Sequence, residues 1–163
     1  MLPKVYIETT IPSYLTSRPS RDIIIAGHQQ VTHDWWSKRR NDFELYISEI
    51  VIRECQAGDP VMARKRLDLL AEIPLLEILP DVDLIANQLI TIGPIPKKAE
   101  TDAAHIAIAA TNGIDYLLTW NCRHIANAEM QEQIREICRQ AGFRMPVICT
   151  PEELLGEERY VER

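Results

Sequence analysis

The sequence predicts a three-layer α/β/α sandwich, in which helices cover both faces of a central, mainly parallel sheet. Short apolar runs alternate with longer segments of helical spacing along the whole chain, a pattern typical of parallel sheets. The composition is that of an ordinary globular domain, with 163 residues of which 46% are hydrophobic and 26% charged. A chain of this length can bury a sizeable core. We therefore expect residues 1–163 to form a single domain.

The first half of the chain alternates between the two kinds of element. A β-rich run at 5–7 ends in hydroxyl residues and Pro12, which indicates a strand that leads into a helical turn. A helix is predicted at 22–39, where apolar residues recur every three or four positions, followed by a strand at 45–47. Ser48 is predicted to cap the next helix, which is expected to end near Gly58, and a further helix is predicted at 61–71. The apolar run 75–79, between two prolines, is predicted as a strand.

The second half continues the alternation. Helices are predicted at 82–92 and, after the proline-rich loop 93–98, at 100–112, where Gly113 ends the helix. A strand at 116–118, a helix at 126–140, a last strand at 147–149 and a terminal helix that starts at Pro151 complete the chain. Ligand sites of parallel sheets lie at the carboxyl ends of the strands. The residues directly after the strands are therefore the candidates for function.

Charge and cysteine usage exclude several classes of protein. The formal net charge is −6, which argues against binding of nucleic acid through bulk positive charge. The longest wholly apolar run, 23–27, is far shorter than the ~20 residues of a membrane span, and the amino terminus does not resemble a signal peptide. The cysteines at 55, 122, 138 and 149 form no CxxC pair, so we expect reduced thiols rather than a zinc site. We expect a cytoplasmic protein without a membrane anchor.

Three acids form the candidate site. Glu8 follows the first strand, Glu54 lies on the helix after the second, and Asp102 lies in the first turn of the helix at 100–112. Converging carboxylates repel one another unless a hard divalent cation binds them, and Mg²⁺ or Mn²⁺ suits such oxygen ligands. Each acid taken singly could instead be a solvated side chain or could stabilise a helix start.

Four segments then carry a family resemblance: YIETT at 6–10, ISEIVIRE at 47–54, TDAAHIAIA at 101–109 and LLTWN at 117–121. In this order and spacing the chain resembles PIN-domain proteins, and within them VapC-type toxins. The resemblance implies a metal-dependent endoribonuclease, the toxin of a type II toxin–antitoxin pair. It further implies a PIN-like fold, an RNA substrate, a cognate antitoxin as partner and a homodimer.

The resemblance also assigns residues to the site. It places catalytic acids at Glu8, Glu54 and Asp102, which would hold the metal, and the fourth acidic position falls on Asn121. The small hydroxyl residues that brace the site match Thr9, Ser48 and Thr119. The chain departs from the family twice, because the first acid is generally Asp rather than Glu8, and Asn121 lacks the charge of the usual Asp. The expected reaction is attack of a metal-bound water on an RNA phosphodiester.

RNA binding near an acidic pocket needs local cations. Lys97, Lys98 and Arg123 rank highest because their sequence neighbours belong to the candidate site. Other candidates are Lys38, Arg39, Arg40 and Arg53.

Aromatic and histidine residues leave alternatives open. Trp120 could stack on a base or belong to the core, while Val31, Trp35 and Trp36 could fill the core or line a groove for a partner helix. The four histidines are scattered along the sequence. Only His105 lies one helical turn from an acid, and we expect it to be a hydrogen-bonded residue of a buried helix.

Two other functions fit the same residues. A catalytically weakened PIN scaffold would bind RNA or a protein without cutting, as Glu8 and Asn121 suggest. A metal-dependent phosphohydrolase for small esters would use the same acids, but the chain has no Gly-rich phosphate loop. Half of the excess negative charge lies in an acidic tail from about residue 151. The net charge of the chain is therefore compatible with RNA binding through a few local cations.

Overall fold

The computed structural model describes residues 1–156, in which four strands form one parallel sheet. The strands β1 (Lys4–Ile7), β2 (Glu44–Tyr46), β3 (Tyr116–Leu118) and β4 (Val147–Cys149) are arranged in the order β2-β1-β3-β4. β1 is central, because Tyr6 pairs with Tyr46 of β2 on one side and with Leu117 of β3 on the other. These pairings confirm the predicted parallel sheet.

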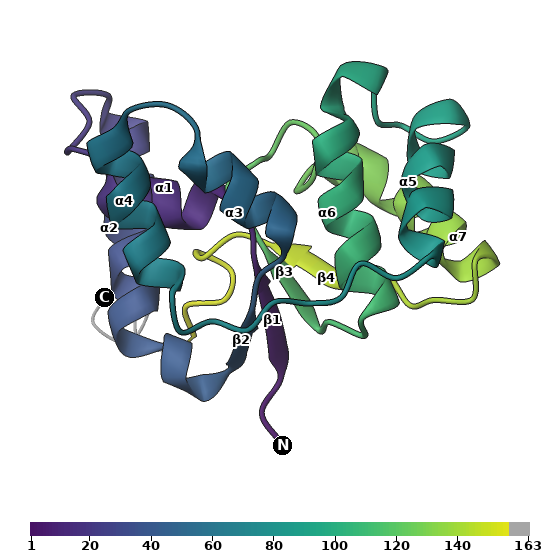
Figure 1. Cartoon of the computed structure of the whole chain (residues 1–163), viewed down its shortest axis with the longest axis horizontal. Helices are drawn as coiled ribbons and strands as arrows, with labels where there is room; N and C mark the ends of the chain where they lie inside the picture. Colours follow the sequence, from purple (N-terminus) through teal and green to yellow (C-terminus); the bar gives the residue numbers. More distant parts are fainter. Residues whose placement is uncertain (157–163) are drawn as a thin grey trace.

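Seven α-helices are present within the described residues: α1 (Thr10–Thr16), α2 (Ile23–Lys38), α3 (Glu49–Gln56), α4 (Pro60–Leu70), α5 (Asp81–Thr91), α6 (Glu100–Thr111) and α7 (Gln131–Gln140). The local sequence explains where several of these helices begin. The Asp22 carboxylate caps α2 by accepting from two backbone N–H groups, and Asp59 does the same for α4, where Pro60 occupies the first position. In Figure 1, α1, α2 and α4 lie on one side of the sheet and α5, α6 and α7 on the other.

The core is centred on β1 and α6. Val5, Tyr6 and Ile7 are fully buried, as expected for a central parallel strand that is covered on both faces. In α6 every residue from 105 to 111 is buried. A helix with so little exposed surface fixes its side chains firmly, which matters for the residues it contributes to the candidate site.

The topology places the candidate site at a switch point. From β1 the chain passes through α1 and α2 to β2 on one side, and then crosses to β3 on the other side of β1. The connections thus diverge at the carboxyl ends of β1 and β3, where a crevice forms in sheets of this kind. Glu8 follows β1 at this point, and Thr119 follows β3.

The predicted strand at 75–79 is wrong. Leu75 forms a single bridge with Ile47, and Leu76 N donates to Ile47 O at 2.7 Å, but the pairing goes no further. Leu75 and Ile78 are 53% and 44% exposed. The flanking prolines and the lack of a buried face explain why this apolar run does not extend the sheet.

The predicted terminal helix at Pro151 is also wrong within the described residues. Residues 151–155 form turns, and Gly156 follows with a φ of 88°, a conformation that ends regular structure. The predicted helix at 126–140 is α7 preceded by a 3-10 turn at Ala128–Met130. Most of the expected acidic tail, from 157 to 163, lies outside the described residues.

Burial decides two of the remaining expectations. Val31 and Trp35 are core residues, at 4% and 0% exposure. Three of the cysteines are buried free thiols as predicted, whereas Cys122 is exposed. Among the described residues no helix combines the length and the apolar character that a membrane crossing requires.

Candidate metal centre

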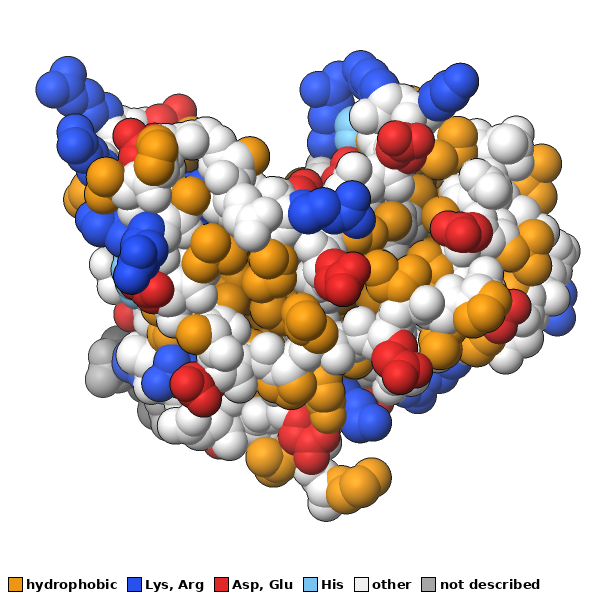
Figure 2. Space-filling model, in the orientation of Figure 1, with side chains coloured by type: hydrophobic (Ala, Val, Ile, Leu, Met, Phe, Trp, Pro, Cys, Tyr) orange, Lys and Arg blue, Asp and Glu red, His pale blue; other side chains and the backbone are white. Residues whose placement is uncertain are grey.

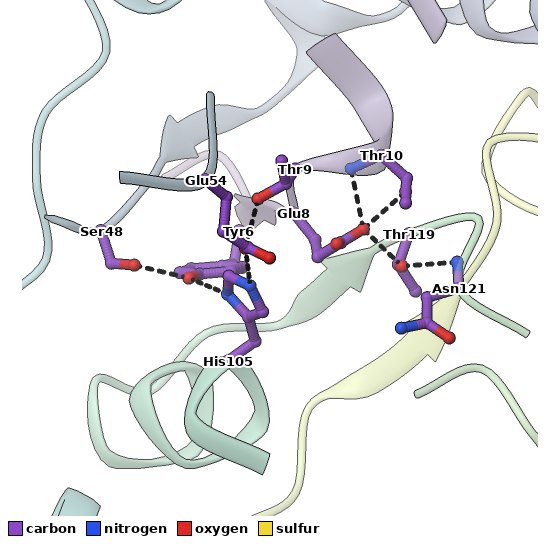
Figure 3. A network of polar contacts seen from close by, with 9 residues as sticks. All are labelled: Tyr6, Glu8, Thr9, Thr10, Ser48, Glu54, His105, Thr119 and Asn121. Atoms are coloured by element: carbon purple, nitrogen blue, oxygen red, sulfur yellow. Dashed lines mark hydrogen bonds and ion pairs between the residues drawn. The ribbon is translucent and has the colours of Figure 1, made fainter. Parts of the chain in front are cut away.

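Glu8 lies directly after β1 and is almost completely buried, with 3% of its surface exposed. Its Oε1 accepts three hydrogen bonds, from the hydroxyl groups of Thr10 and Thr119 and from the backbone N–H of Thr10 (Figure 3). The Thr10 hydroxyl in turn accepts from Trp120 N at 2.8 Å. The carboxylate of Glu8 therefore ties the end of β1 to the end of β3.

Glu54 projects from α3 toward the same place. Its Oε1 accepts from the Thr9 hydroxyl at 2.6 Å and bonds His105 Nε2 at 2.6 Å. The Glu54 side chain is 34% exposed, whereas His105 is fully buried in α6. One side of the Glu54 carboxylate is thus held by the protein while the group still reaches the surface.

A buried chain of hydrogen bonds supports His105 from behind. Tyr6 OH lies 2.7 Å from His105 Nδ1 and 2.7 Å from Ser48 Oγ (Figure 3). A carboxylate can only accept, so His105 Nε2 carries the proton in its bond to Glu54. In the neutral imidazole Nδ1 then accepts from Tyr6, and Tyr6 accepts from Ser48. The expectation that His105 is a hydrogen-bonded residue of a buried helix is confirmed.

The two carboxylates have opposite pKa shifts. Burial raises the pKa of Glu8, although His105 and the hydrogen bonds from Thr10 and Thr119 oppose this effect. Burial also acts to raise the pKa of Glu54, but the hydrogen bonds from His105 and Thr9 and the electrostatic attraction of the His105 ring outweigh it, and the pKa of Glu54 lies below its usual value. Glu54 is therefore the acid that stays ionised, while Glu8 holds its proton more strongly.

The donor set fits a hard divalent cation. Glu8, Glu54 and His105 each offer one ligand atom, and these atoms lie within 4.8 Å of one another. Both nitrogens of His105 already have protein partners, so His105 orients Glu54 and the carboxylates would be the ligands. Among the described residues each carboxylate uses Oε1 for protein bonds and leaves Oε2 without a hydrogen bond. Two such oxygens suit Mg²⁺ or Mn²⁺.

The third expected acid, Asp102, lies outside this group of three. Its Oδ2 is 3.2 Å from Nδ1 of His124, and both side chains are largely covered, with 19% and 15% exposure. Asn121 is also engaged, because its Oδ1 accepts from the backbone N–H of His124 at 3.0 Å. The predicted role of Asp102 in holding metal and the predicted catalytic role of Asn121 stay predictions, and in this structure both residues contact His124.

The expected supporting residues all lie in the network. Thr9 bonds Glu54, Ser48 bonds Tyr6, and Thr119 bonds Glu8 while also accepting from Asn121 N at 2.9 Å. Tyr6 and His124 were not predicted. Tyr6 had one signal in the sequence, since a hydroxyl within an apolar central strand needs a buried partner. His124 gave none, because its contact with Asp102 joins positions that are distant along the chain.

The expected RNA-binding cations lie on the surface. Lys97, Lys98 and Arg123 are exposed, the first two in a 3-10 turn directly before α6. Trp120 is stacked on His28, with ring centroids 4.1 Å apart, and its Nε1 donates to Thr32. One face of Trp120 is therefore already covered. In Figure 2 the molecule is notched at its upper edge, with basic side chains on the right rim of the notch and acidic side chains at its base.

Comparison with known proteins bears on the fold. No family model and no curated protein matches the sequence. The fold is similar to that of a chain in the crystal structure of VapBC2 from Rickettsia felis bound to a DNA fragment from their promoter. The TM-score is 0.57 at 13% identity, over 90% of this chain and 98% of that chain. The predicted three-layer, PIN-like α/β/α fold is thereby confirmed.

Proposed function

We propose that this chain is a metal-dependent endoribonuclease and the toxin of a toxin–antitoxin pair. The observation that carries the proposal is the convergence of Glu8 and Glu54 at the switch point of a PIN-like sheet, each with one carboxylate oxygen left open. The structural neighbour is a VapBC2 complex, which agrees with this function and with a protein partner. The basic side chains beside the notch in Figure 2 supply contacts for an RNA backbone.

The residues of the candidate metal centre have two roles, metal binding and orientation of the metal ligands. Glu8 and Glu54 would hold Mg²⁺ or Mn²⁺, which when bound lowers the pKa of a coordinated water and offsets charge on the phosphate. Thr10 and Thr119 fix the orientation of Glu8, and Thr9 and His105 fix that of Glu54. Because Glu8 holds a proton more strongly than usual, metal binding has to displace that proton.

A nuclease assay with matched variants tests the proposal. The purified chain is incubated with mixed RNA in Mg²⁺, in Mn²⁺ or in EDTA, beside Glu54→Gln, Asp102→Asn and, as a control, Glu49→Gln. Glu49 is exposed in the first turn of α3, so its replacement should leave cleavage unchanged. We expect Glu54→Gln to lower the rate at least about a hundredfold, because an oriented carboxylate ligand is removed. Cleavage in EDTA, or full activity of Glu54→Gln, would refute the proposed metal centre.

The contacts of Asn121 favour a second candidate function. Its side-chain oxygen caps the turn at His124 and replaces the charged acid of the family pattern. The metal centre is then weaker than in the family, and the chain could be a scaffold that binds RNA or a protein without cutting. The same assay separates the two functions: RNA binding without cleavage in either metal would establish the scaffold.

The partner and the oligomeric state belong to the same proposal. We expect a short reading frame beside the gene to encode the antitoxin. Co-expression of the two should give a stable complex, and the chain alone should form a homodimer. Light scattering of the purified chain measures the oligomeric state, and a monomer at all concentrations would contradict the homodimer.

A further inference from the structure

The cavity between α3, α5 and α6 adjoins the acid pair. It has a volume of about 410 Å³, and Glu54 forms part of its lining. α5 packs on α6 and α3 packs on α4, so the cavity separates two groups of helices. In Figure 2 hydrophobic and charged side chains lie side by side in the centre of this face. Whatever binds at Glu54 therefore has room to extend into this cavity.

The helix α5 turns one face toward the cavity and another face toward the core. α5 contributes Asp83, Ala86, Asn87 and Ile90, which lie at helical spacing on one face, while its core face carries Val82, Ile85 and Leu89. The cavity face of α5 is thus polar at its first turn and apolar at its last. Such a face is not needed for folding, because the helix already has a buried side.

The lining combines apolar walls with a polar edge. Ile50 of α3, Ile90 of α5 and Ala104 of α6 provide flat apolar contacts. Asp83, Asn87, Glu100 and Thr101 provide hydrogen-bonding groups. Asp83 and Glu100 are exposed, and within the part of the chain that the structure describes their carboxylates have no hydrogen bond or ion pair with the protein and are free to bind a ligand. A planar group with donors on its edge matches this arrangement.

The charge of the cavity lining determines which chemical class of ligand can bind there. Its lining holds one cation, Arg53, and three carboxylates, those of Glu54, Asp83 and Glu100. A phosphate would be repelled, whereas a neutral base with N–H donors would be attracted. The volume is ample for one base of a single strand, and unpaired bases are the parts of RNA that proteins read in sequence-specific binding.

We propose that this cavity is a subsite for the nucleobase beside the scissile phosphate, and that it selects bases with an exocyclic amino group. Cytosine, adenine and guanine carry such a group, from which the carboxylates of Asp83 and Glu100 accept. Uracil has only the N3–H donor on this edge and presents the acceptor O4 in place of an amino group, so it is disfavoured. The inference rests on the proposed ribonuclease function, because it places the base relative to the bond that is cut.

Matched oligonucleotides test this subsite. A cleavage site is first mapped in mixed RNA, and short RNAs are then made with cytidine or uridine on either side of it. The two bases have nearly the same size. They differ at position 4, which is an amino donor in cytosine and an oxygen acceptor in uracil, and at N3, which carries a hydrogen in uracil alone. We expect cytidine to be preferred about tenfold at one flanking position, and Asp83→Asn combined with Glu100→Gln to abolish this preference. Asp81→Asn, on the same helix but outside the cavity, is the control.

Binding in EDTA, where no cleavage occurs, separates this inference from the proposed function. Fluorescence anisotropy with oligocytidine and oligouridine of equal length, which need no mapped cleavage site, should show the cytidine preference in the wild-type chain and its absence in the double variant. If the chain prefers cytidine but cuts no RNA with either metal, the subsite stands and the proposed activity fails. If the chain cuts RNA without distinguishing cytidine from uridine, or if the double variant keeps the preference, the subsite is refuted.

Discussion

At the scale of single residues, the two glutamates carry the same carboxyl group, but their different environments shift its pKa in opposite directions. Glu8 is enclosed at the end of β1, and burial raises its pKa, whereas His105 and Thr9 lower the pKa of the more exposed Glu54. Opposed shifts in neighbouring acids are common in functional sites. The sequence identified both glutamates through their places after strands β1 and β2. It could not predict the shifts, which depend on contacts between distant segments.

The raised pKa of Glu8 leads to a pH-dependent prediction. In the unfolded chain Glu8 loses its proton at a lower pH than in the folded chain, so stability falls as the pH rises from the unfolded pKa to the folded pKa. Glu8→Gln has no proton to lose and keeps an oxygen that can accept from Thr10 and Thr119. In EDTA above neutral pH we expect a higher Tm for Glu8→Gln than for wild type, with the difference vanishing at low pH. A gain of 1 kcal/mol would raise Tm by about 2–4 °C.

Thermal unfolding followed by circular dichroism at several pH values measures this effect. Adding Mn²⁺ should raise the Tm of wild type, because a bound ion stabilises the folded state, and should leave Glu8→Gln nearly unchanged. Glu49→Gln, at an exposed site, should behave as wild type in both conditions. A lower Tm for Glu8→Gln at every pH would show that the charged carboxylate stabilises the fold.

At the scale of elements, β1, α3 and α6 are joined by one polar chain. Ser48 precedes α3, Tyr6 lies within β1 and His105 lies within α6, and their hydrogen bonds end on Glu54. Burial raises the pKa of Tyr6, so its hydroxyl keeps the proton that it donates to His105. The three elements could be predicted from periodicity and capping, but their crossing angles could not. For this reason Tyr6 was missed although its strand was correctly placed.

Removing one hydroxyl tests this polar chain. Tyr6→Phe keeps the packing of β1 but leaves buried Nδ1 of His105 without its donor, which should cost about 1–3 kcal/mol of stability. With His105 less firmly placed, we expect Mn²⁺ affinity, measured by titration calorimetry, to fall about 10–100-fold. Tyr46→Phe is the control, since the Tyr46 hydroxyl bonds Glu44 rather than a member of the polar chain. Equal Mn²⁺ affinity in Tyr6→Phe and wild type would exclude a positioning role.

At the scale of the whole molecule, alternation of strands and helices was sufficient to predict the fold. Strand 116–118 and strand 147–149 were predicted with their observed bounds, because each is a short apolar run between clear helix ends. The run at 75–79 is also largely apolar, but it pairs with the sheet through one bridge alone. Strand pairing depends on tertiary contacts, so the apolar pattern alone predicted a strand where the chain forms none.

The charge distribution gives the last prediction. The formal net charge of −6 means that RNA must be held by a few local cations, so binding should be weak and should fall steeply with salt. Lys97→Ala combined with Lys98→Ala, next to α6, should weaken binding for all RNA sequences alike. The slope of log K against log salt should become shallower by about 1.4, which is 0.7 for each single-strand phosphate that the protein no longer neutralises.

Fluorescence anisotropy between about 50 and about 200 mM salt measures this slope. Lys65→Ala, an exposed lysine on α4, is the control and should leave the slope unchanged, because α4 lies on the other side of the sheet from α6 (Figure 1). An unchanged slope in the double variant would place the RNA backbone elsewhere on the surface.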